Sequence, residues 1–177
     1  MAVFVSFLPV IVLMAASRLL PRRTALLVSL ISAAATLAPW ALGGPAKQFS
    51  LVLGALIAAG FVWTLVHEAS AERWSGLLVT GGIALYAFAT IALGHPFAEQ
   101  WAHERVPESQ WAHPLTIHIV TTITAVWGAI YVVLALNTYP RERWRLPSSA
   151  RAALPVVLVV AGIAFTSWYP GYAVANH

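Results

Sequence analysis

Cysteine and aspartate are both absent from this chain, and charged residues of any kind are scarce. Of the 177 residues, 9% are charged and 60% are hydrophobic, and all six acidic residues are glutamate. Soluble domains carry about 25% charged residues, so this surface has too little charge to face water. The missing cysteines exclude disulfides, thiolate nucleophiles and thiolate-bound metals. The composition therefore predicts a membrane protein whose outer surface faces lipid.

Six apolar runs are each long enough to cross a bilayer core of roughly 30 Å as a helix of about 20 residues. None of them shows the strict two-residue alternation of a membrane β-barrel. The chain is short enough for one domain, so we predict a single polytopic transmembrane domain over residues 1–177. The predicted fold is an all-α membrane protein with six transmembrane helices, over Ala2–Leu20, Thr24–Leu42, Ser50–Glu68, Trp74–Gly94, Pro114–Leu136 and Ala150–Trp168.

Basic residues alternate along the connections between these runs. Of the ten basic residues, only Lys47 and Arg105 lie in the second and fourth connections. Basic loops stay in the cytoplasm, so both termini are predicted outside it. The first run lacks the basic segment that opens a signal peptide, and we expect it to remain as a span.

The fourth connection is the longest polar passage of the chain. Phe97, Trp101 and Val106 fall near one face, and glutamates, Gln100 and His103 populate the rest. This pattern predicts a short helix in the outer interface with its apolar side turned toward the membrane, ended by Pro107. The passage is expected to be an ordered lid or docking surface.

Histidines in and after this connection are candidate ligands. Imidazole and carboxylate groups bind zinc or copper, although the spacing matches no compact metal motif. A single axial histidine to haem or a chlorin is a further alternative, and a solvated polar loop is the plain interpretation. The candidate cofactor or metal ligands are His95, His103, His113 and His118.

Catalytic and transport signals are missing from the predicted spans. Every Arg, Lys and Glu lies at a span end or in a connection, whereas ion-coupled transporters need charged groups within the membrane. Neither a nucleophile–base pair nor a nucleotide-binding motif appears, so we predict no enzyme and no nucleic-acid partner. Four arginines of the fifth connection are candidate contacts for anionic lipid headgroups: Arg141, Arg143, Arg145 and Arg151.

Small and hydroxyl-bearing residues occur within the spans. Gly54 and Ala58 lie four residues apart, glycines line the fourth run, and threonines crowd the fifth. Small residues let helices approach closely in lipid, and threonine hydroxyls bond across helices. Packing is the plain interpretation, and a path for a small solute is the alternative.

Several short motifs occur along the chain: FLPVIV at Phe7–Val12, His67 with Trp74, PFAEQ at Pro96–Gln100, VPESQW at Val106–Trp111 and AVWGAIYV in the fifth run. These pieces resemble motifs of the intracellular septation protein A family, whose members are bacterial inner-membrane proteins. The resemblance implies an envelope protein that acts through membrane partners, and it supplies no catalytic residues.

Taken together, these features favour a non-enzymatic protein that serves as a scaffold or accessory subunit of a larger membrane assembly. Its expected partners are membrane lipids and other membrane proteins. A small-solute channel or carrier is the alternative, supported by the threonines and glycines of the fourth and fifth runs. A haem-, chlorin- or metal-binding membrane protein is the second alternative.

Overall fold

The computed structural model describes residues 8–138 and 147–176, apart from residues 10, 14, 17–18 and 42–47. Every regular element in this part is a helix, which confirms the predicted all-α class. The elements are α2 (Arg22–Ala41), α3 (Gln48–Val66), α4 (Glu68–Ala92), α5 (Glu99–Ala102), the 3-10 turn η1 (Glu108–Gln110), α6 (Pro114–Thr138) and α7 (Ser148–Asn176).

Four segments are long and apolar enough to cross a membrane: Gln48–Val66, Trp74–Ala92, Pro114–Thr138 and Ala153–Asn176. They correspond to the third to sixth predicted runs. The second run forms α2, whose apolar part, Arg23–Ala38, is shorter. Much of the first run lies outside the described residues. Four of the six predicted spans are therefore confirmed as long apolar helices, and six remains a prediction.

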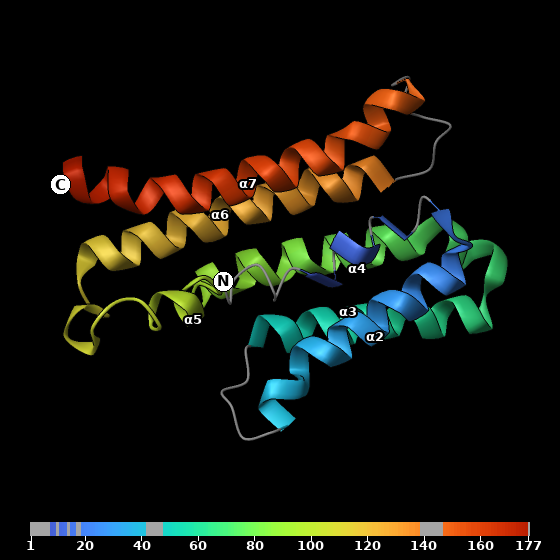
Figure 1. The fold of residues 1–177 in the computed structure, drawn as a ribbon, viewed down its shortest axis with the longest axis horizontal. Helices are drawn as coiled ribbons and strands as arrows, with labels where there is room; N and C mark the ends of the chain where they lie inside the picture. Colours follow the sequence, from blue (N-terminus) through green and yellow to red (C-terminus); the bar gives the residue numbers. More distant parts are fainter. Residues whose placement is uncertain are drawn as a thin grey trace.

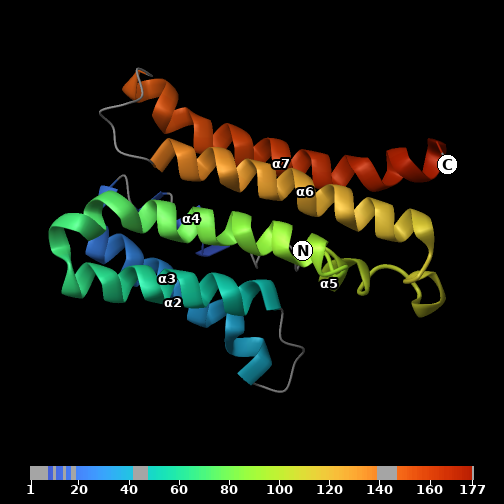
Figure 2. The same ribbon diagram turned by 180° about the vertical axis from the view of Figure 1, so that it is seen from behind.

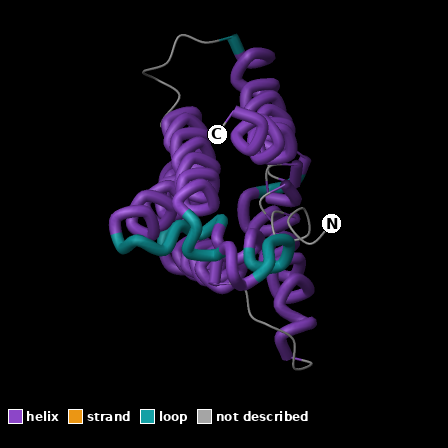
Figure 3. The backbone as a smooth tube through the Cα atoms, turned by 90° about the vertical axis from the view of Figure 1, so that its left-hand side faces the viewer, coloured by secondary structure: helices purple, strands orange, loops and turns teal. Residues whose placement is uncertain are grey.

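The long helices form a curved row in which sequence neighbours are mostly spatial neighbours. Helix α4 lies between α3 and α6, α2 packs on the other side of α3, and α7 packs on α6 (Figures 1 and 2). Seen from the side, α6 and α7 stand together at one end of the row (Figure 3). The most tightly packed pair is α4 with α6, and the loop that joins these two helices crosses over their ends.

Close packing of α7 on α6 depends on a glycine. A Cβ at Gly162 would lie 2.8 Å from Ile130 Cδ1 and 3.1 Å from two ring atoms of Trp127. Trp127 is 2% exposed, and its Nε1 donates to Thr166 Oγ1 on α7, which holds the ring in place. Small residues of this kind allow helix backbones to approach in lipid.

Helix α7 continues to Asn176, beyond the predicted end at Trp168, although Pro170 removes one backbone donor from it. Packing on both sides of the proline supports the extension. Ala173 is buried, and the Tyr169 hydroxyl lies 3.1 Å from His118 Nε2 on α6. Helices in lipid tolerate proline where neighbouring groups compensate for the lost hydrogen bond.

Candidate functional site: a cavity beneath the loop between α4 and α6

A glycine turn starts the loop. Gly94 has φ of +78°, which a residue with a side chain rarely adopts. Its N–H bonds to the Ile91 carbonyl and the N–H of His95 bonds to the Thr90 carbonyl, each at 3.0 Å. This is the Schellman pattern of helix termination, and it turns the chain sharply back from α4 toward α6.

Two buried threonines then hold the loop backbone. Thr90 Oγ1 on α4 accepts from the Phe97 N–H at 3.2 Å, and Thr124 Oγ1 on α6 accepts from the Ala98 N–H at 3.3 Å. Gln100 Oε1 accepts from the Phe49 N–H in the first turn of α3 at 3.4 Å. The loop is therefore fastened to three helices, which fits the prediction of an ordered element.

The apolar side of the loop packs against protein. Phe97 and Trp101 are 2% and 6% exposed. The Phe97 ring stacks on Phe49 at 5.1 Å between centroids, and Trp101 meets both rings edge-on. The predicted interfacial helix is only the short α5, and Pro107 precedes η1. Because Phe49 and its neighbours offer a buried aromatic surface, the apolar face of the loop turns into the bundle.

Two histidines of the loop, His95 and His103, lie beside one carboxylate. Glu99 lies 3.6 Å from His95 Nδ1 and 3.3 Å from His103 Nε2. The His103 ring stacks on Trp111 with centroids 3.9 Å apart. Among the residues that the structure describes, no three His or Glu side chains are arranged to hold a metal ion.

The other two candidate ligands take part in helix contacts. His113 Nδ1 accepts from the Leu115 N–H at 3.2 Å and so satisfies a free donor at the start of α6. His118 contacts Tyr169 across the α6–α7 interface. His95 and His103 thus share Glu99, whereas His113 and His118 contact other groups, and the role of all four as cofactor or metal ligands remains a prediction.

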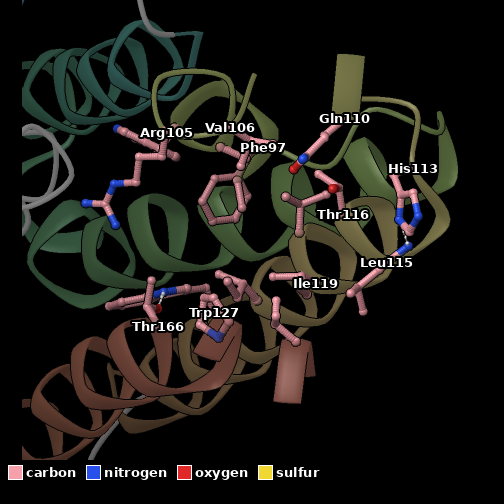
Figure 4. Close-up of a pocket in the computed structure, with 17 residues that line it drawn as sticks. Phe97, Arg105, Val106, Gln110, His113, Leu115, Thr116, Ile119, Trp127 and Thr166 are labelled. Atoms are coloured by element: carbon pink, nitrogen blue, oxygen red, sulfur yellow. Dashed lines mark hydrogen bonds between the residues drawn. The ribbon is translucent and has the colours of Figure 1, made fainter. Parts of the chain in front are cut away.

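A cavity of about 450 Å³ lies between the loop, α6 and α7. This volume is within the range of roughly 300–1,000 Å³ found for small-molecule sites. Figure 4 shows Phe97 facing its centre, with Arg105 on one side of that ring and His113 on the other. The loop supplies the roof, and apolar residues of the two long helices supply the walls.

The cavity wall is apolar along α6, and its deepest polar groups are paired. Leu115, Ile119, Ile123 and Trp127 line it over roughly 18 Å, at 1.5 Å of helix rise per residue. Trp127 Nε1 donates to Thr166 Oγ1 at 2.9 Å, and that hydroxyl donates to the Gly162 carbonyl at 2.8 Å. These bonds leave the wall without free side-chain donors at this point.

The roof of the cavity is polar. Arg105, Gln110 and His113 line it from the loop, and Thr116 lines it from the first turn of α6. Sequence reasoning identified Phe97, Trp101 and the histidines but missed the cavity. Its walls come from the loop and the two helices that follow it, and no local motif records that their packing leaves a space between them.

The arginines predicted to contact lipid headgroups have no described side chains. Arg141, Arg143 and Arg145 lie outside the described residues, and Arg151 lies in α7 with its side chain outside them. Their role as headgroup contacts stays a prediction.

Comparison with known proteins finds no relative of this chain, so a function is assigned from the geometry of the structure. No protein-family model matches this chain. A search of curated proteins and a search of solved structures likewise find no match.

Proposed function

We propose that this chain is a non-enzymatic bacterial inner-membrane protein with six transmembrane helices and both termini outside the cytoplasm. It would act as a scaffold or accessory subunit of a larger membrane assembly. The four long apolar helices support a membrane location, and the alternating basic connections support the orientation. The resemblance to the septation protein A family agrees with a role exercised through membrane partners.

The observation that carries the proposal is the light attachment of α7. In its apolar segment 11% of the residues are buried within the chain, against 50% in the corresponding segment of α6. Among the described elements α7 packs substantially only on α6. A helix held from one side leaves most of its surface to an external neighbour.

The exposed face of α7 has the features of a helix-binding surface. Ala164, Ser167, Gly171 and Ala175 are all exposed and recur at intervals of three or four residues, so they share one face. A Cβ on Gly171 would meet no atom within 4 Å. Small residues at this spacing allow a second helix to approach closely in lipid, whereas lipid contact alone does not require them.

Aromatic residues flank this small-residue face. Trp168 and Tyr172 are 57% and 49% exposed, and their rings stack with centroids 4.8 Å apart. Large aromatic side chains that are already ordered contribute strongly to protein interfaces. The small-residue face and the aromatic pair together favour a transmembrane helix of a protein partner.

Threonine hydroxyls of α6, which motivated the channel alternative, have contacts inside the protein. Thr124 accepts from the loop backbone, and Thr122 Oγ1 lies 3.5 Å from the Tyr169 hydroxyl. These contacts account for both residues without a solute path, so the accessory-subunit role is better supported.

The test is co-purification of the tagged full-length protein from its native membrane in mild detergent, followed by native mass spectrometry. We expect a stoichiometric protein partner that is lost when Ala164 and Gly171 are both replaced by leucine. The matched control replaces both Ala55 and Ala59 by leucine, which adds similar bulk at two exposed positions of α3. A partner retained by the double variant, or a wild-type protein that carries only lipid, would overturn the proposal.

A further inference from the structure

We propose that the cavity beneath the loop binds one amphipathic molecule with a single aliphatic chain and an anionic head. The chain would lie against α6 and α7, and the head would pair with Arg105. This site is independent of the proposed partner-binding role.

The charge of the residues that line the cavity favours a ligand with an anionic head group. Arg105 is the one side chain with a permanent charge among the described residues that line the cavity. The Arg105 guanidinium can pair with an anionic ligand, because it forms no ion pair with any of the described residues. Glu99 on the same loop faces His95 and His103. A guanidinium binds carboxylate or phosphate oxygens through paired hydrogen bonds.

The length and the apolar character of the cavity walls favour a ligand with one aliphatic chain. The α6 wall presents Ile119, Ile123 and Trp127, and α7 adds Pro170 and Val174. An extended aliphatic chain suits an apolar wall of roughly 18 Å, which follows from the rise of α6. The volume of about 450 Å³ is near the lower end of the range for small-molecule sites, which favours one chain over the two of a phospholipid.

The deep polar groups do not compete with this assignment. Trp127 and Thr166 are bonded to each other, and the Thr166 hydroxyl is also bonded to Gly162. A polar ligand group placed there would find these side chains already engaged. Free charge for pairing is therefore supplied by Arg105 in the loop, and its position orients the ligand.

The experiment measures binding of three probes to the full-length protein in nanodiscs of neutral lipid. Oleate and oleyl alcohol share one chain and differ in head charge, and oleoyl lysophosphatidylglycerol carries a phosphate head. We expect each anionic probe to bind about twofold to fivefold more tightly than oleyl alcohol, the worth of one exposed ion pair. The tighter of the two anionic probes identifies a carboxylate or a phosphate head.

Two variants separate the head from the tail. Arg105→Gln should abolish the preference for anionic probes and leave oleyl alcohol binding unchanged, whereas Arg23→Gln on α2, the matched charge control, should preserve the preference. Ile119→Trp should weaken all three probes by filling the cavity. Equal binding of oleate and oleyl alcohol to the wild-type protein, or an anionic preference that survives Arg105→Gln, would overturn the proposal even if Ile119→Trp failed to fold.

Discussion

Thr124 is fully buried on α6, and its hydroxyl accepts the Ala98 N–H of the loop. A backbone donor buried without a partner is costly, because it loses water and gains nothing in return. Thr90 does the same for Phe97 from α4. The position of the cavity roof therefore depends on single oxygen atoms of two different helices.

Thr124→Val removes the hydroxyl and keeps the shape of the side chain. We expect it to lower the free energy of unfolding by about 1 kcal/mol, since the Ala98 N–H loses its acceptor. Thr121→Val, at a partly buried position of the same helix, serves as the control. Reversible unfolding in mixed micelles measures the difference, and equal stability of the two variants would show that the hydrogen bond contributes nothing.

The close packing of α7 on α6 depends on the absence of a side chain at Gly162, where an added Cβ would meet Ile130 and Trp127. Another helical glycine, Gly81, has room for a methyl group, with the nearest atoms 3.9 Å from an added Cβ. The two positions thus offer the same substitution in a crowded and in an open environment.

Gly162→Ala should be less stable than Gly81→Ala by about 1–3 kcal/mol, the usual cost of overpacking. Both variants gain the same helix propensity, about 1 kcal/mol, so their difference isolates the contact with Trp127 and Ile130. Thermal unfolding in detergent, followed by the near-ultraviolet signal of the tryptophans, provides the measurement. A Gly162→Ala protein as stable as Gly81→Ala would mean that α7 can shift without cost.

Helix positions were predictable because a long apolar run carries its own signal, and the runs from Gln48 to Thr138 appear close to where the pattern places them. The end of α7 was misplaced, since packing of Ala173 sustains the helix beyond Pro170. The sequence pattern also could not predict which surface the side chains of Phe97 and Trp101 would pack against. An apolar loop face looks the same whether lipid or Phe49 covers it.

The predicted orientation of the whole molecule is directly testable because the chain has no cysteine. Ser109 in the loop and Ser149 near the start of α7 are both exposed. A membrane-impermeant maleimide applied to intact spheroplasts should label Ser109→Cys and should label Ser149→Cys only after lysis. The basic fifth connection is expected in the cytoplasm. The reverse labelling pattern would invert the topology.

Helix α7 provides one wall of the cavity and exposes its small-residue face beside that wall. A molecule that occupies the cavity and a protein that binds the small-residue face therefore act on the same helix. If binding on either side shifts α7, thermodynamic linkage requires each partner to alter the affinity of the other by the same factor. Through α7, occupancy of the cavity by a ligand would thus change how tightly this protein binds its membrane partner.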